Sequence, residues 1–191
     1  MPSVSYRNWR TTRRAVLNAV EAAHATIHGT GIGRREATRQ LNHGYTMLLA
    51  AEFQGFCREL HTEAIQHFVA TLPATQQNIV SEEFTFNRQL DKGNATPASI
   101  GSDFGRLGLK WWAALDKLDP AAANLRRQLE SLNNWRNAIA HNNFDPLVLG
   151  GTMRLRLAMV QEWRWVCNRF ARLFDELMVA HLVTVTGRRP W

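Results

Sequence analysis

The chain has 191 residues, 45% of them hydrophobic, and a formal net charge of +7 at pH 7. A chain of this size can bury one substantial core, so we expect a single domain over residues 1–191. No apolar run approaches the roughly 20 residues that cross a bilayer, and the arginine-rich start lacks a signal-peptide core, which predicts a cytoplasmic protein. Cys57 and Cys167 lie in apolar helical patterns, which favours buried thiols over a disulfide. The excess of arginine indicates a polyanion as a partner.

Helical periodicity organises the first half of the chain. Apolar residues at helical spacing predict a helix over residues 9–28, which ends at the glycine-rich segment 29–33. We interpret that segment as a helix-breaking loop, because no strand precedes it and no Gly-Lys-Ser/Thr sequence follows. A long amphipathic helix is predicted over residues 34–70. A short helix near 75–91 and a loop to Ile100 are expected after it.

The second half predicts three more helices, over residues 102–118, 121–140 and 153–182. Asp119 and Pro120 have the character of an N-cap and a first-turn proline before the second of these. No segment shows the two-residue alternation that strands need. The pattern therefore predicts an all-α, up-and-down bundle of four principal helices with one or two short inserted helices.

Glu52 lies within the apolar stripe of the long helix, four residues after Leu48 and four before Phe56. A carboxylate on a buried face is costly unless a hydrogen-bond donor meets it. We expect Glu52 to reach Arg136 or Asn137 on a neighbouring helix and to support their orientation. The alternative is that Glu52 lies at the edge of the stripe and reaches solvent.

Arg136, Asn137 and His141 stand together at the end of the helix predicted over 121–140. Arginine keeps its charge near neutral pH and holds phosphate oxygens in a planar fork, whereas histidine can donate or accept a proton there. Together, these side chains suit the cleavage of a phosphodiester.

The spacing of the three residues limits how they can cooperate. At about 100° per residue, Asn137 and His141 lie nearly above one another, whereas Arg136 and His141 diverge by roughly 140°. Either the chain turns at His141, which Asn142 and Asn143 permit, or the site combines residues from two copies of the helix. A purely structural alternative is that Arg136 and His141 only cap helix carbonyls.

The block Arg136-Asn137-x-x-x-His141 resembles the signature of the HEPN superfamily (higher eukaryotes and prokaryotes nucleotide-binding), in which arginine, a polar residue, three variable residues and histidine follow one another. The segment 41–56, an apolar run interrupted by an acidic residue, is similar to the long second helix of several such families. The resemblance covers about 41–70 and 121–182, and it implies a small all-helical fold.

In RNA-cutting members of the superfamily, two protomers share a cleft that cleaves RNA without a metal. The resemblance therefore implies a homodimeric endoribonuclease in which Arg136 stabilises the charged phosphorane, His141 moves the proton of the 2′-hydroxyl or the leaving oxygen, and Asn137 orients both. It also implies a toxin of a toxin-antitoxin or phage-defence system, with an antitoxin protein as a possible partner. Asn143 stands where one branch has a tyrosine that the antitoxin modifies, so the resemblance does not predict that mode of silencing.

Two rival functions were considered. His24 and His28 are four residues apart, as metal ligands on one helix face would be, but no cysteine or acidic cluster completes a ligand set. We therefore expect no metal and no cofactor. The other rival is a non-catalytic helical module of the same fold that binds RNA or a protein, since a fold can persist without its activity.

Overall fold

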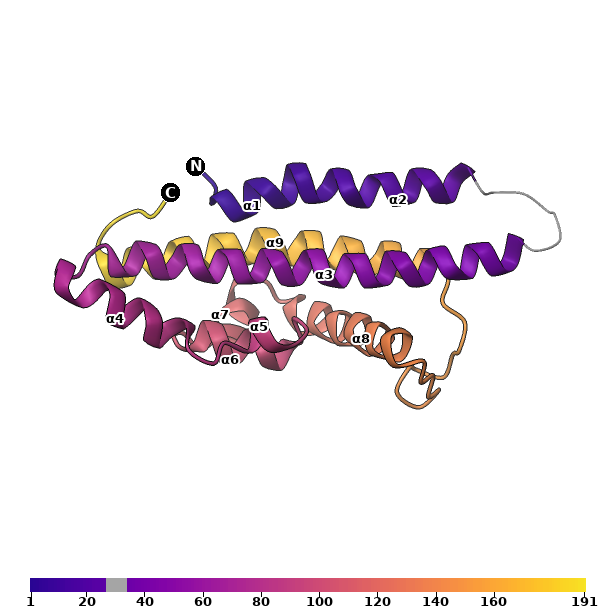
Figure 1. Ribbon diagram of the computed structural model, residues 1–191. Coiled ribbons are helices and arrows are strands. Elements are labelled where there is room, and N and C mark those ends of the chain that lie inside the picture. Colours follow the sequence, from indigo (N-terminus) through magenta and orange to yellow (C-terminus); the bar gives the residue numbers. More distant parts are fainter. Residues whose placement is uncertain (27–33) are drawn as a thin grey trace.

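The computed structural model describes residues 1–26 and 34–191, and every regular element in these ranges is helical (Figure 1). The chain begins with α1 (Val4–Asn8), the π-helical turn η1 (Trp9–Arg13) and α2 (Arg14–Thr26), which follow one another without a break. The later helices are α3 (Arg34–Val69), α4 (Ala74–Thr85), α5 (Gln89–Lys92), α6 (Pro97–Gly105), α7 (Trp111–Leu118), α8 (Ala122–His141) and α9 (Leu157–Thr186). The predicted all-α class is confirmed.

The two longest helices, α3 and α9, run parallel and pack against each other along the molecule (Figure 1). In this view the helix formed by α1, η1 and α2 lies on one side of the pair, and α8 with the short helices α4 to α7 lies on the other. Successive long helices alternate in direction, as in an up-and-down bundle. The C-terminal end of α8 consequently lies near the start of α9.

Aromatic rings join these helices into one core. The ring centroid of Phe53 lies 5.8 Å from that of Trp9 and 6.1 Å from that of Phe174. Phe174 in turn lies 5.0 Å from Trp111, edge to face. Rings at these separations add specific contacts to the burial of large apolar areas. The N-terminal helix, α3, α7 and α9 are therefore fixed to one another through their aromatic side chains.

The start of the N-terminal helix is fastened by carboxylates from distant elements. Glu63 on α3 accepts hydrogen bonds from the backbone N–H groups of Val4 (2.8 Å) and Ser5 (3.0 Å) and from Ser5 Oγ (2.6 Å). Asp175 on α9 accepts one from the N–H of Ser3 (3.1 Å). The first N–H groups of a helix have no partner within the helix. These contacts satisfy them and bind α1 to both central helices.

The predictions of a loop up to Ile100 and of one helix over 102–118 are wrong. α6 already begins at Pro97, because Thr96 Oγ1 accepts a hydrogen bond from Ser99 N (3.1 Å) and proline suits the first turn. The helix ends at Gly105, and Gly108 then takes a left-handed φ of 84°, so α7 begins anew at Trp111.

The other predicted helices hold with shifted ends. The long helix over 34–70 is confirmed by α3, and the one over 121–140 by α8. The predicted N-cap at Asp119 and first-turn proline at Pro120 are wrong, because the N-cap of α8 is Ala121. Asp119 Oδ1 instead accepts from Ala121 N (3.0 Å) in the turn that precedes the helix. The first helix starts earlier than predicted, the short one is divided into α4 and α5, and the last one is displaced to Leu157–Thr186. The predicted glycine loop over 29–33 lies outside the described residues.

Both cysteines are buried free thiols, as the sequence predicted. Burial raises the pKa values of both thiols. The nearby Cys167 raises the pKa of Cys57 further. A thiol that resists deprotonation is a poor nucleophile. These two side chains therefore act as small apolar core groups.

His61 is fully buried in α3, with its Nε2 donating a hydrogen bond to the backbone carbonyl of Asp103 (3.0 Å) and its ring edge-on to Phe104. Its Nδ1 is buried and has no partner among the described residues. Burial lowers the pKa of His61 to about 4, and the cations Arg88 and Arg106 act in the same direction. The ring is therefore neutral at physiological pH, with its proton on Nε2.

Candidate active site at the C-terminal end of α8

The helix α8 remains regular through His141 and ends in a left-handed cap. Asn142 has φ 49° and ψ 40°, its N–H donates to Ile139 O (3.3 Å), and the N–H of Asn143 donates to Ala138 O (2.9 Å). This pair of hydrogen bonds is a Schellman motif, in which asparagine can replace the usual glycine. The chain therefore turns at Asn142 and not at His141, so the first alternative considered from the sequence does not apply.

The three motif residues lie on adjoining faces of α8, and Arg136 follows the buried Leu129 and Leu132 on the same face of the helix. Trp135 and Ala138 are buried, Arg136 is half-buried, and Asn137 and His141 are exposed. On a regular helix Asn137 lies about 100° round from Arg136, and His141 a further 40° or so. Asn137 thus stands between the other two on one continuous surface.

Asn137 connects two neighbouring side chains on this surface. Its Oδ1 accepts a hydrogen bond from Arg136 Nη1 (3.2 Å) and another from Asn94 Nδ2 (2.6 Å). The Arg136 guanidinium is therefore bent round the helix towards the side that carries His141. The structure joins Arg136 to Asn137 by this hydrogen bond, but it shows no contact between Arg136 and His141 within the described chain.

Arg136 forms no ion pair among the described residues, and the side chain of His141 has no hydrogen bond there. A guanidinium without a carboxylate partner can bind phosphate oxygens. An exposed imidazole can transfer a proton.

The segment between α5 and α6 is tied to α8 beside the motif. Asn133 is buried and its Nδ2 donates to Ala95 O (3.1 Å) and to Leu129 O (2.9 Å), while the adjacent Asn94 reaches Asn137. Sequence reasoning missed Asn94, because the contact joins residues 43 positions apart. The only sequence signal was its place in the irregular stretch before α6.

Phe144 fixes the chain that follows the motif. Its ring stacks on His43 of α3 with centroids 5.7 Å apart, and it also lies 6.3 Å from the buried ring of Trp135. Burial, with the nearby Arg39 cation, lowers the pKa of His43. A neutral imidazole stacks on an aromatic ring without the cost of burying a charge. The exit from α8 is thus held against α3.

The supporting role predicted for Glu52 is wrong. Glu52 forms an ion pair with Arg13 of the N-terminal helix, and the same guanidinium binds Glu59 through Nη2 (2.6 Å). A Cβ atom at Gly55 would lie only 2.7 Å from Arg13 Nη2, so this glycine lets the arginine lie flat on α3. The N-terminal helix covers this face of α3, and α8 packs on the other side (Figure 1).

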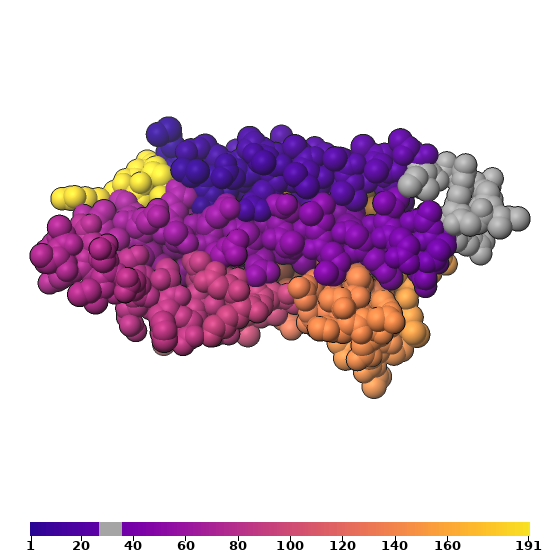
Figure 2. All heavy atoms as spheres, in the orientation of Figure 1, coloured from indigo at the N-terminus to yellow at the C-terminus, as the bar shows by residue number. Residues whose placement is uncertain are grey.

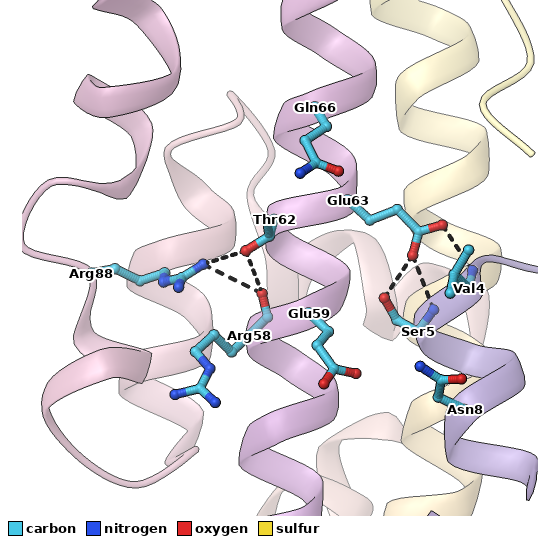
Figure 3. A pocket seen from close by; sticks show the side chains of 9 residues that line it. All are labelled: Val4, Ser5, Asn8, Arg58, Glu59, Thr62, Glu63, Gln66 and Arg88. Carbon is cyan, nitrogen blue, oxygen red and sulfur yellow. Dashed lines mark hydrogen bonds between the residues drawn. The ribbon is translucent and has the colours of Figure 1, made fainter. Parts of the chain in front are cut away.

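A hollow of about 520 Å³ lies elsewhere, between the start of α1, the C-terminal third of α3 and Arg88 (Figure 3). Figure 3 shows Glu63 turned towards Val4 and Ser5, while Arg88 donates to Thr62 Oγ1 (2.8 Å) on the other side of α3. Arg88 is also paired with Asp91 (2.8 Å). Glu63, Thr62 and Arg88 are thus engaged with other groups of the protein, whereas Glu59 Oε2 is buried without a partner among the described residues. We assign no function to this hollow.

The histidines do not gather into a metal site in the part of the chain that the structure describes. No group of three or more His, Cys, Asp or Glu side chains there is placed to hold a metal ion. His24 Nε2 lies 3.1 Å from Asn42 Oδ1, and His28 is outside the described ranges. In the same ranges, no helix is long and apolar enough to cross a membrane.

Comparison with known proteins gives one match. The RiboL-PSP-HEPN family matches residues 16–177, a span that runs from α2 into α9 and includes the whole candidate site. No curated protein and no solved structure matches the chain significantly.

Proposed function

The chain belongs to the RiboL-PSP-HEPN family, and on that basis we propose that it is an endoribonuclease that cleaves RNA at Arg136 and His141 without a metal ion. HEPN membership, first suggested by the motif itself, is established by the family match. The observation that carries the proposal is the end of α8, where Asn137 holds a guanidinium that has no carboxylate partner among the described residues and where His141 is exposed.

The proposed chemistry follows from these groups. A neutral imidazole takes the proton of the ribose 2′-hydroxyl, whose oxygen attacks the adjacent phosphorus. The bond from phosphorus to the 5′ oxygen breaks, and a water molecule gives that oxygen a proton. The products are a 2′,3′-cyclic phosphate and a 5′-hydroxyl end. Arg136 stabilises the extra negative charge on the phosphorane, and Asn137 holds Arg136 in place.

The geometry of α8 supports the proposal of a homodimer. On this regular helix Arg136 and His141 diverge by roughly 140°, and no contact joins them within the described chain. We therefore propose that Arg136 of one copy and His141 of a second copy meet in a shared cleft, so that each site takes one group from each chain.

The test uses purified wild type with Arg136→Ala, His141→Ala and a control, Arg127→Ala, which removes an exposed arginine of the same helix. RNA is incubated with each protein in the presence of EDTA. We expect cleavage by wild type and by the control, and a loss of about 100-fold or more in the two site variants. Mixing the two site variants should recover measurable cleavage, because each supplies what the other lacks.

Three outcomes would count against the proposal. Activity that disappears in EDTA would indicate a metal enzyme, and equal activity in all four proteins would place the reaction elsewhere. RNA binding without cleavage would favour the alternative of a non-catalytic binding module. Mixed variants that stay inactive would contradict the shared cleft.

For the biological role we propose a toxin of a toxin-antitoxin or phage-defence system that acts on RNA in the cytoplasm and is restrained by a partner protein. This rests on the family resemblance of the motif. Induced expression of wild type should arrest growth, whereas Arg136→Ala and His141→Ala should be tolerated. Harmless expression of active wild type would contradict this role.

A further inference from the structure

Residues 74–86, which we call the acidic arm, extend from the end of α3 and are weakly attached. No residue of α4 is buried, and the arm is held by Phe84, whose ring lies 5.7 Å from that of Phe68, and by a hydrogen bond from Gln77 Nε2 to Leu72 O (3.0 Å). Ile79 and Phe86 are 71% and 67% exposed. Large apolar side chains this exposed on a projecting element are typical of an interaction surface.

The charges of the arm are of one sign. Glu82 and Glu83 are its only charged residues, although the whole chain carries +7. Both are exposed, and neither forms an ion pair with any residue in the described ranges. Their field is therefore open to a positively charged partner.

The arm also contains a hollow of about 470 Å³, lined by Glu83, Phe84, Phe86 and Arg106. Arg106 donates hydrogen bonds to the backbone carbonyls of Phe84 (3.3 Å) and Phe86. These bonds occupy the arginine and hold Phe86 at the rim. The hollow can accept an aliphatic side chain beside a carboxylate.

A matching surface lies in residues 142–156, which we call the basic loop and which project beyond the bundle (Figure 2). Leu147 is 92% exposed and Met153 64%, whereas Leu155 is buried and holds the loop to the core. Arg154 and Arg156 are exposed and form no ion pair among the described residues. Asp145, the one acidic residue of the loop, accepts a hydrogen bond from Leu147 N (2.9 Å) within its own turn.

We infer that the acidic arm of one copy docks on the basic loop of a second copy. Leu147 enters the hollow beside Phe84 and Phe86, and the two arginines meet Glu82 and Glu83. The arm and the loop lie at opposite ends of one edge of the molecule, with α8 between them (Figures 1 and 2). A two-fold axis across that edge makes both contacts at once and brings the two α8 helices together. The inference rests on the proposed function only in assuming that the active form is a dimer.

Charge reversal tests the pairing by sedimentation, without RNA. We expect wild type to be a dimer and both Glu82→Lys/Glu83→Lys and Arg154→Glu/Arg156→Glu to dissociate at least tenfold more readily. A mixture of the two variants should form a dimer again, because the reversed charges are complementary. Glu162→Lys/Glu176→Lys, which reverses two exposed glutamates of α9, serves as the matched control and should remain a dimer. A monomeric wild type, or arm variants as dimeric as the control, would overturn the inference.

Cross-linking tests the geometry. Both native cysteines are buried, so a cysteine placed on the surface is the reactive one. A bismaleimide should join Ile79→Cys to Leu147→Cys when the two single variants are mixed, and should give little product with either alone. A dimer without the mixed product would show that another surface is used.

The two proposals fail in different ways. If the mixed cross-link forms but no RNA is cut, the interface stands and the proposed function fails. If RNA is cut and mixing of the site variants restores cleavage while the cross-link is absent, the function stands and this interface is wrong.

Discussion

The neutral, buried His61 predicts that the protein loses stability in mild acid. The folded-state pKa is about 4, whereas the ordinary value is 6.5. Between these pH values His61 is protonated in the unfolded chain but not in the folded chain. The free energy of unfolding therefore falls as the pH is lowered. At pH 7.5 neither state is protonated and the effect is absent.

The size of the effect follows from the two pKa values. Linkage gives a loss of about 2–3 kcal/mol between pH 7.5 and pH 4.5, and little more below pH 4, where both states are protonated. The physical cause is the position of Nδ1, which is buried and without a partner among the described residues, so a second proton there would be a buried charge.

The assay is urea unfolding followed by tryptophan fluorescence from pH 7.5 to 4.5, on wild type and His61→Gln. Glutamine can keep the hydrogen bond to Asp103 O but does not titrate. The free energies of unfolding of wild type and variant therefore differ by a term that does not depend on pH and by the pH-dependent contribution of His61. The difference between the two proteins should change by about 2–3 kcal/mol in favour of the variant as the pH falls. A difference between wild type and His61→Gln that stays flat with pH would refute the reasoning.

Three further predictions follow from contacts described above. Glu52→Gln weakens the ion pair with Arg13 and should lower the free energy of unfolding by about 1–2 kcal/mol in chemical denaturation, without changing RNA cleavage. A loss of cleavage in a folded variant would show that Glu52 does support the site. Asn142→Ala places a side chain with no αL preference at φ 49° and should lower stability by about 1 kcal/mol, whereas Asn142→Gly should be nearly neutral in the same thermal melt. Asn94→Ala removes the hydrogen bond to Asn137 and should reduce cleavage roughly 3- to 10-fold, with unfolding changed by less than about 1 kcal/mol; an equal loss in the folded fraction would show a merely structural role.

The sequence predicted those parts of the fold that depend on local periodicity and capping. The helices over 34–70 and 121–140 were placed closely, because each carries a continuous apolar stripe and ends at a recognisable signal. The helix over 102–118 was wrong, because its apolar spacing continues across Gly105 and Gly108 although the backbone turns there. Periodicity reports which residues are apolar, and it does not report a local change of backbone conformation.

For the candidate site, the position of the motif at a helix end could be predicted but its neighbours could not. A partner on α8 was predicted for Glu52 because the sequence shows a carboxylate on a buried face of α3, but it does not show which helix covers that face. Arg13 and Asn94 lie 39 and 43 residues from their partners, and no local pattern encodes such contacts. The roles of Arg136, Asn137 and His141 remain proposals, to be decided by the cleavage experiments.

The wide turn at Trp9–Arg13 has a consequence for how this protein can vary. A π-helical turn takes about one residue more than an α-helical turn for nearly the same rotation, so it holds a surplus residue while α1 and α2 keep their directions. Deleting one position there, such as Thr11, can convert the turn to α-helix and leave Ser3 and Ser5 beside Asp175 and Glu63. A deletion within α2 would instead turn everything upstream by about 100° and carry both serines away from these carboxylates.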